Sequence, residues 1–245
     1  MSVRVEDAYV AAWRAGRRVA EPTGLLERWA TSPRRPVRHV RSLFAIHDVA
    51  DMIDLDLAWW SYPAIDAVDA LLAERGGQAR VFEYGAGAST AWLASRSGSV
   101  TSVEHDAGFA EFLAPLLAGS RNTTLRLVPA GPAQQRAVGS RRRGHAGLDF
   151  SEYVTAIDDV AGEFDLVVVD GRARVACVRA ALPRLAPDGV VLLDNADRDE
   201  YAAVVGDPSL QVRVLRGATP CLPCPTSTAL LLSLIHISEP TRLQV

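Results

Sequence analysis

The segment FDLVVVD at residues 164–170 constrains the fold of this chain more than any other stretch. It is apolar almost throughout and rich in β-branched side chains, which is the pattern of a strand buried on both faces. Such a strand belongs to a parallel sheet that is covered by helices on each side. The segment therefore predicts an α/β protein.

Strand and helix patterns alternate along most of the chain around this segment. Helical spacing of apolar residues separates most of the predicted strands, which supports a mostly parallel sheet with helices on both faces. The other predicted strands are residues 80–84, 100–104, 125–128, 189–195, 210–215 and a final TSTALLL segment. We also predict helices within residues 150–161, 174–186 and 199–205.

The N-terminal section has a different pattern from the remainder. Residues 1–60 contain short helical patterns, and a basic, proline-containing segment at residues 31–41 is predicted to be a linker between them. This section has too little apolar mass to fold alone. We therefore predict an N-terminal helical cap at 1–60 on a main domain at 61–231.

The amino-acid composition changes near the C-terminus. All 26 basic residues are arginine, whereas the string LSLIHISEPTR at residues 232–242 departs from the composition of the preceding chain. This string resembles a translated sequencing adapter. Residues 232–245 are therefore predicted to be a non-native tail, and they are left out of the functional reasoning.

Composition and charge narrow the class of protein. The chain is 49% hydrophobic and 22% charged, with a net charge of −3, as expected of a soluble globular protein. No apolar run approaches the roughly 20 residues that cross a bilayer, and three cysteines make no paired disulfide framework. We therefore expect a cytoplasmic protein with no membrane partner, and the near-neutral balance leads us to expect no nucleic-acid partner.

A glycine-rich turn follows the first strand of the predicted sheet. Gly85 and Gly87 allow the backbone to turn sharply and to approach a ligand closely. Glu83 precedes them, where its carboxylate can meet a cationic group, and Ser89 and Thr90 start the next helix, where they can cap it or contact a ligand. Thr90 stands where a dinucleotide-binding motif has its third glycine, which disfavours NAD.

An acidic residue ends the next predicted strand. Glu104 follows the glycine turn by about 20 residues, the distance at which an acid can accept hydrogen bonds from ribose hydroxyls. His105 is its neighbour and is a candidate to line the same pocket. Ligands of open α/β sheets bind at the carboxyl ends of the strands. The turn and Glu104 therefore predict one nucleoside-binding pocket.

These segments and the turn at residues 187–189 resemble the class I S-adenosylmethionine-dependent methyltransferases over residues 61–231. The lead-in at 59–65 resembles that of an uncharacterised bacterial branch. The resemblance implies a Rossmann-like sheet of seven strands, the last one antiparallel, and S-adenosylmethionine as the cofactor. It also implies that Glu83 faces the amino-acid end of the cofactor, that Gly85 and Gly87 line it, and that Glu104 holds its ribose.

Polar residues also end two later strands. Asp170 follows the strand at 164–169, and Asp194 and Asn195 end the strand at 189–195. The arrangement resembles the cation-dependent catechol-type O-methyltransferases, and that resemblance implies a Mg²⁺ site formed by these three residues. Two other readings stay open, because Asp170 can instead act in catalysis without a metal or simply start an Asp-Gly turn.

Several functions remain open at this point. The first is methyl transfer to a small molecule, more specifically to oxygen, with Asp170 as the catalytic residue. The alternatives are an aminopropyl-transfer enzyme on the same fold and a non-catalytic nucleoside-binding module. The run Arg141–Arg143 with His145 is a candidate lid, although a solvated loop is the favoured explanation. The acceptor and the oligomeric state stay undetermined.

Overall fold

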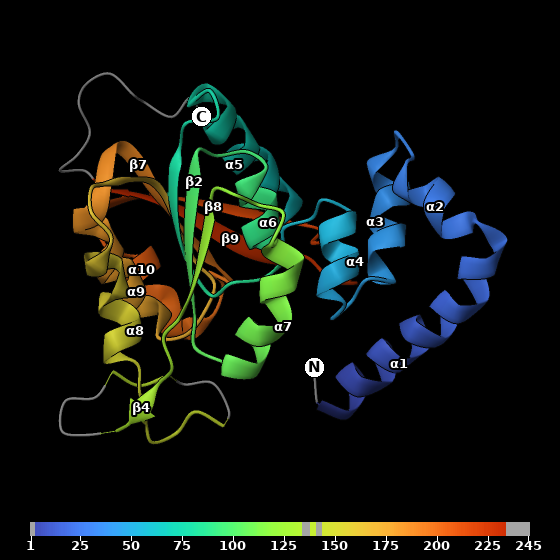
Figure 1. Cartoon of the computed structure of the whole chain (residues 1–245), viewed down its shortest axis with the longest axis horizontal. Helices are drawn as coiled ribbons and strands as arrows, with labels where there is room; N and C mark the ends of the chain where they lie inside the picture. Colours follow the sequence, from blue (N-terminus) through green and yellow to red (C-terminus); the bar gives the residue numbers. More distant parts are fainter. Residues whose placement is uncertain (1–2, 134–137, 141–143, 234–245) are drawn as a thin grey trace.

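The structure is a computed structural model, and it describes residues 3–133, 138–140 and 144–233. A seven-stranded sheet forms its centre (Figure 1). The strands are β1 (Arg80–Tyr84), β2 (Ser99–Glu104), β3 (Thr123–Leu127), β6 (Phe164–Val169), β7 (Leu185–Asp194), β8 (Leu210–Gly217) and β9 (Thr226–Ser233). They lie in the order β3-β2-β1-β6-β7-β9-β8, and β9 runs antiparallel to both of its neighbours. The predicted Rossmann-like, mostly parallel sheet with an antiparallel last strand is confirmed.

Helices cover both faces of the sheet, as predicted. One face carries α5 (Tyr62–Glu74), α6 (Ala88–Ala94) and α7 (Ala107–Leu117), and the other carries α8 (Ser151–Thr155), α9 (Arg174–Ala181) and α10 (Ala202–Val205) (Figure 1). Successive residues of β6 alternate between the two cores, because Val167 packs with the α8–α9 side and Val168 with the α5–α6 side. Both are fully buried, which explains the continuous apolar run in the sequence.

Four α-helices form the N-terminal section, and they lie beside the sheet rather than on its two covered faces (Figure 1). They are α1 (Val3–Ala20), α2 (Leu25–Ala30), α3 (Arg35–Leu43) and α4 (Val49–Asp54). The prediction of a linker at residues 31–41 is wrong, because α3 spans most of it. Pro36 lies in the first turn of α3, where no helical N–H is required. Arg41 is buried and forms a two-pronged ion pair with Asp51 of α4.

The N-terminal helices pack on the segment that follows β1. Trp13 of α1 meets Phe44 edge-on, with their ring centroids 4.7 Å apart. Ile46 and Met52 join a buried cluster that also contains Ala88, the first residue of α6. The cap therefore covers one side of the glycine-rich turn that leads into α6.

Two boundaries differ from those expected from the sequence. The helix predicted over residues 174–186 ends at Ala181 and continues as a short 3-10 helix, Leu182–Arg184, because Pro183 cannot extend an α-helix. Strand β7 consequently begins at Leu185, before the turn at 187–189. The helices predicted at 150–161 and 199–205 are each divided between an α-helical and a 3-10 turn.

The last strand extends beyond the expected domain boundary. Strand β9 continues to Ser233, and Leu232 is buried in the core on the α5–α6 face. Residues 232 and 233 of the predicted tail are therefore part of the sheet, whereas 234–245 lie outside the described residues. Arg141–Arg143 of the candidate lid also lie outside them. Within the described part of the chain, no helix combines the length and apolarity that crossing a bilayer requires.

Candidate functional site

The two glycines of the turn after β1 differ in what surrounds them. Gly85 adopts a φ of +95°, and a Cβ built on it would lie 2.6 Å from both the Cα and the N of Gly171. The loops after β1 and β6 therefore touch through glycines. Gly87 is extended, and a Cβ on it would meet only Ser89 Oγ, at 3.9 Å. Packing requires the first glycine, whereas the space beside the second is open.

Glu83, the predicted contact for the amino-acid end of a cofactor, is fully buried at the end of β1. Its carboxylate accepts hydrogen bonds from the hydroxyls of Ser89, Thr90 and Ser102, each at 2.5 Å. Burial raises the pKa of Glu83 to about 7, and the nearby Asp170 adds to the shift. In this structure Glu83 joins β1 to the start of α6 and to β2.

The hydroxyl of Ser102 was missed in the sequence analysis. Ser102 stands directly beside Glu83 in the parallel pairing of β1 and β2, so a correct strand register would have identified it. Thr90 has a second role, because its Oγ1 also accepts a hydrogen bond from the Gly87 N–H at 3.0 Å. The first turn of α6 is thereby fixed against the glycine-rich turn.

Glu104 lies at the carboxyl end of β2, as predicted, and is 4% exposed. Its Oε1 accepts hydrogen bonds from the N–H groups of His105 and Asp106, at 2.7 and 2.8 Å. Among the described residues, none donates a hydrogen bond to Oε2. The backbone thus holds the carboxylate in place while one oxygen remains able to accept hydrogen bonds from a ligand.

His105 lies beside Glu104 within a group of aromatic rings. Its Nδ1 is 2.6 Å from Glu104 Oε1, and its Nε2 is 3.3 Å from Nε2 of His145. The rings of Phe150 and Tyr153 have centroids 5.7 and 6.1 Å from that of His105. The segment after β3 therefore returns to the end of β2 and forms an apolar wall beside Glu104.

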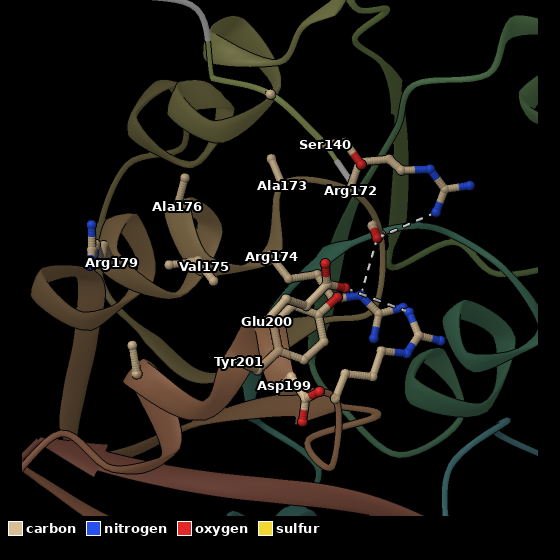
Figure 2. Close-up of a pocket in the computed structure, with 14 residues that line it drawn as sticks. Ser140, Arg172, Ala173, Arg174, Val175, Ala176, Arg179, Asp199, Glu200 and Tyr201 are labelled. Atoms are coloured by element: carbon tan, nitrogen blue, oxygen red, sulfur yellow. Dashed lines mark hydrogen bonds and ion pairs between the residues drawn. The ribbon is translucent and has the colours of Figure 1, made fainter. Parts of the chain in front are cut away.

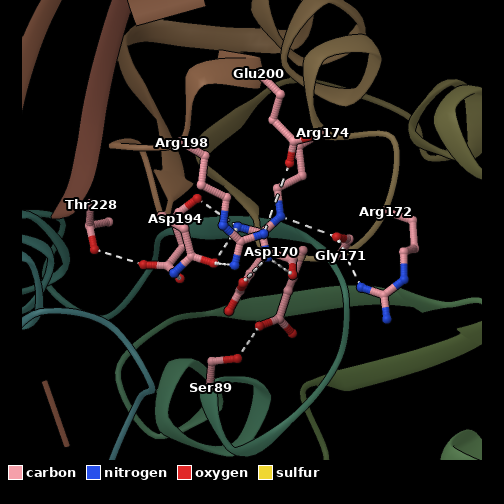
Figure 3. A network of polar contacts seen from close by, with 11 residues as sticks. Ser89, Asp170, Gly171, Arg172, Arg174, Asp194, Arg198, Glu200 and Thr228 are labelled. Atoms are coloured by element: carbon pink, nitrogen blue, oxygen red, sulfur yellow. Dashed lines mark hydrogen bonds and ion pairs between the residues drawn. The ribbon is translucent and has the colours of Figure 1, made fainter. Parts of the chain in front are cut away.

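The ends of β6 and β7 meet around Arg174, which the sequence analysis did not single out (Figure 3). This guanidinium is 6% exposed. Its Nη2 donates to Asp170 Oδ1 at 2.6 Å, and its Nη1 donates to the backbone oxygen of Asp194, also at 2.6 Å. Its Nε donates to the backbone oxygen of Gly171 at 3.1 Å. One buried cation thereby joins the carboxyl ends of both strands.

Both carboxylate oxygens of Asp194 have partners from the protein. Thr228 of β9 donates to Oδ1 at 2.8 Å, and the Asn195 amide donates to Oδ2 at 2.6 Å. Arg198 in turn donates to Oδ1 of Asn195. Burial raises the pKa of Asp194 to about 7, and repulsion from Asp170 contributes. The predicted cluster of Asp170, Asp194 and Asn195 does form, but with its polar atoms bound internally.

A cavity of about 960 Å³ opens next to this network (Figure 2). It lies between the start of α9, residues 139–140 and the turn after β7. Gly171 and Arg174 form part of its wall, so the cavity borders the loop that follows Asp170. The remaining wall is formed by Gly139, Ser140, Arg172, Ala173, Val175, Ala176, Arg179, Arg198, Asp199, Glu200, Tyr201 and Ala203.

Comparison with known families identifies this arrangement. The profile of a family described as "Methyltransferase domain" matches residues 82–196, the stretch from Glu83 to Asn195 that forms the site. The chain therefore carries a methyltransferase domain, and its resemblance to the class I S-adenosylmethionine-dependent methyltransferases is confirmed. The protein is an enzyme that uses S-adenosylmethionine, which favours the first of the three functions left open by the sequence over a non-catalytic module.

One solved methylase structure shares the fold, and two further methyltransferase structures are similar to the chain at lower TM-scores. An rRNA methylase from Streptococcus thermophilus is 18% identical, with a TM-score of 0.50, over 72% of this chain and 99% of that one. A methyltransferase-like protein from Silicibacter pomeroyi is 22% identical over 68% of this chain and 84% of that one, with a TM-score of 0.45. A putative methyltransferase from Streptococcus mutans in complex with SAH is 12% identical over 69% and 97%, with a TM-score of 0.45. No curated protein matches the chain.

The predicted magnesium site of this methyltransferase is not supported. Within residues 3–133, 138–140 and 144–233, no three His, Cys, Asp or Glu side chains come together in a way that could hold a metal. The physical reason is Arg174, a permanent cation that already binds Asp170 and the Asp194 backbone. The amide of Asn195 is also turned so that its nitrogen faces Asp194. The residues present do not fit Mg²⁺.

Proposed function

We propose that this methyltransferase transfers the methyl group to an oxygen atom of a small molecule. The cavity beside the Asp170 loop carries the proposal, because its volume of about 960 Å³ is that of a small-molecule site. It also lies at the carboxyl ends of the strands, where open α/β sheets bind their ligands. The overall charge of −3 supports a small acceptor over a polyanionic one.

The residues of the first two strand ends fit the cofactor. When bound, S-adenosylmethionine supplies a methyl group on a positively charged sulfur. Oε2 of Glu104 is available to accept hydrogen bonds from the ribose, and the open space beside Gly87 allows a ligand to approach the backbone. His105 would line the same pocket. Gly85, Ser89, Thr90 and Glu83 would act by fixing the shape of the turn, since their contacts are internal.

Asp170 is the proposed catalytic residue. Arg174 donates a hydrogen bond to its Oδ1, and the Trp60 side chain also acts on this carboxyl as a hydrogen-bond partner that lowers its pKa. Burial raises the pKa of Asp170 above its ordinary value, although Arg174 opposes the shift. The Asp170 side chain is 24% exposed, and a partly exposed carboxylate with a raised pKa can accept the proton of an acceptor hydroxyl as the methyl group transfers. Arg174 would keep the carboxylate directed at that hydroxyl.

Calorimetry with S-adenosylhomocysteine and a methyl-transfer screen of small hydroxylated acceptors test this proposal together. We expect micromolar binding, transfer that is unaffected by EDTA, and at least a roughly 100-fold lower kcat for Asp170→Asn with unchanged S-adenosylhomocysteine affinity. Arg213→Gln is the matched control, because Arg213 is exposed on β8, away from the cavity. Full activity of Asp170→Asn would refute the assigned role, and methyl transfer only to nitrogen or carbon would refute O-methylation.

RNA is the second candidate acceptor, and one surface favours it. A cleft of about 660 Å³ between α1 and α7 contains Arg14, Arg18 and the exposed ring of Phe112. Arginines next to aromatic rings suit single-stranded nucleic acid, and the rRNA methylase from Streptococcus thermophilus shares the fold. The screen therefore includes total RNA as an acceptor. Methyl incorporation into RNA alone would replace the small-molecule proposal.

A further inference from the structure

The charge of the cavity differs from that of the chain as a whole. The chain has a net charge of −3, yet arginines outnumber acids on the cavity wall. They come from the loop after β6, from α9 and from the turn after β7. The charged lining residues are Arg172, Arg174, Arg179, Arg198, Asp199 and Glu200.

Arg172 donates a hydrogen bond to the backbone oxygen of Gly171 at 3.4 Å, and two further arginines also have partners from the protein. Arg174 is buried and bound to Asp170. The Arg198 side chain is 48% exposed and binds Asn195, but its Nη1 is as far as 4.0 Å from Glu200. Arg174 is therefore committed to the network inside the protein, whereas Arg198 keeps part of its guanidinium open to the cavity.

Arg179 differs from both of them. It projects from α9 at the cavity wall (Figure 2), and within the described part of the chain it forms no hydrogen bond or ion pair. Its charge interacts with Asp207 only at longer range. Arg179 is exposed, and its guanidinium donors are therefore available to a ligand at the edge of the cavity.

The backbone adds to the positive potential on the same wall. Helix α9 begins at Arg174, and its first residue and the preceding Ala173 both line the cavity. No side chain caps this end of the helix. The positive end of the helix dipole therefore lies at Arg174 and adds to the positive potential on this part of the wall, whereas Arg179 stands in the last turn of the helix. In a cleft with low-dielectric walls such fields are concentrated and attract anions.

We infer that the methyl acceptor carries an oxyanion, a carboxylate or a phosphate group, which binds in this cavity through Arg179 while Arg198 adds to the attraction. The inference rests on the proposed function, because it assigns the acceptor class for the same cavity. A guanidinium matches the two oxygens of either oxyanion with parallel hydrogen bonds. The acceptor hydroxyl is then the opposite end of a bifunctional molecule, directed toward Asp170.

Binding of simple oxyanions to the full chain saturated with S-adenosylhomocysteine tests the inference. The probes are inorganic phosphate and benzoate, with neutral benzamide as the control, titrated by calorimetry or NMR. We expect phosphate or benzoate to bind and benzamide not to bind. Arg179→Gln should weaken the bound oxyanion about tenfold, since a charge-assisted hydrogen-bond pair is lost. Arg213→Gln on β8 should leave the affinity unchanged, because this exposed arginine lies outside the cavity.

The outcomes separate this inference from the proposed function. Binding of phosphate alone or of benzoate alone supports it and identifies which oxyanion the cavity prefers. Failure of both probes, equal binding of benzamide and benzoate, or an unchanged affinity in Arg179→Gln overturns it. Binding of S-adenosylhomocysteine is recorded on the same samples. If that binding is present while the oxyanion is not bound, only the acceptor class is wrong, whereas its absence contradicts the proposed cofactor site.

Discussion

Replacing Arg174 by methionine is expected to destabilise this enzyme far more than the loss of an exposed arginine would. The guanidinium is 6% exposed and donates to the backbone oxygens of Asp170, Gly171 and Asp194 as well as to Asp170 Oδ1. Methionine fills similar space but donates nothing. The substitution therefore leaves the partly buried Asp170 carboxylate without its counter-charge and several carbonyl oxygens without a donor.

The expected loss follows from the number and burial of these groups. Removing one partner of a buried ion pair typically costs about 3–5 kcal/mol, because the remaining charge stays desolvated. For a chain of this length each kcal/mol lowers Tm by roughly 2–4 °C, so we expect Arg174→Met to lower Tm by about 10 °C. Arg174→Lys should lose less, since it keeps the charge but cannot reach all the acceptors at once.

Urea and thermal unfolding measure this loss, with Arg213→Met as the control that should change stability by less than about 0.5 kcal/mol. The double variant Asp170→Asn/Arg174→Met keeps the test valid if the single variant is poorly folded. Because asparagine carries no charge, the double variant should be more stable than the sum of the two single effects by at least about 1 kcal/mol. Additive effects, or a loss below about 1 kcal/mol for Arg174→Met, would refute the role of Arg174 as the internal counter-ion.

Four further predictions concern the cofactor side of the site. Gly85→Ala should destabilise the fold by more than about 2 kcal/mol in urea unfolding, because its Cβ would lie 2.6 Å from Gly171 at a φ of +95°. Gly87→Ala should unfold like the wild type but bind S-adenosylhomocysteine at least about tenfold more weakly, and an equal affinity would show that the space is not used. Glu104→Gln should likewise weaken calorimetric binding about tenfold without a change in Tm, since an amide oxygen can still accept from the His105 and Asp106 N–H groups. The folded pKa of about 7 for Glu83 lies above its ordinary value, so the folded state binds the proton more tightly. The contribution of the Glu83 carboxyl to the free energy of unfolding is complete at low pH and is lost as pH rises from about 4.5 to 7. Glu83→Gln should therefore flatten that part of the stability–pH profile. An unchanged slope in this variant would contradict the assigned role of Glu83.

The sheet could be predicted from the sequence because each strand has a pattern of residue types that is visible within the strand itself. The continuous apolar run of β6 follows from burial of Val167 on one face and Val168 on the other, and this can be read from residue types alone. The prediction of a linker at residues 31–41 is wrong because of contacts in the tertiary structure. The helix there, α3, depends on a buried ion pair between Arg41 and Asp51 ten positions away, which composition does not reveal.

The same distinction applies to the site. The strand-end position predicted Glu104, and the structure holds that carboxylate through the two N–H groups that follow it. The sequence pattern could not show that Thr228 donates a hydrogen bond to Asp194, because that contact requires β9 to insert between β7 and β8. Arg174 could have been noticed from its position four residues after Asp170. Its effect on a metal site depends on the distance between two strand ends, which only the fold determines.

The position of β9 has a consequence for synthesis of the protein on the ribosome. This strand is formed by residues 226–233, yet it separates β7 from β8 in the sheet. Until those residues leave the ribosome, β8 has no neighbour in the sheet and the Asp194 carboxylate lacks the Thr228 hydroxyl. The nascent chain must therefore expose an unpaired edge of β7 for a time, and such edges are prone to pair with other chains. Production of the enzyme should thus benefit from conditions that protect nascent chains, such as slow induction or abundant chaperones.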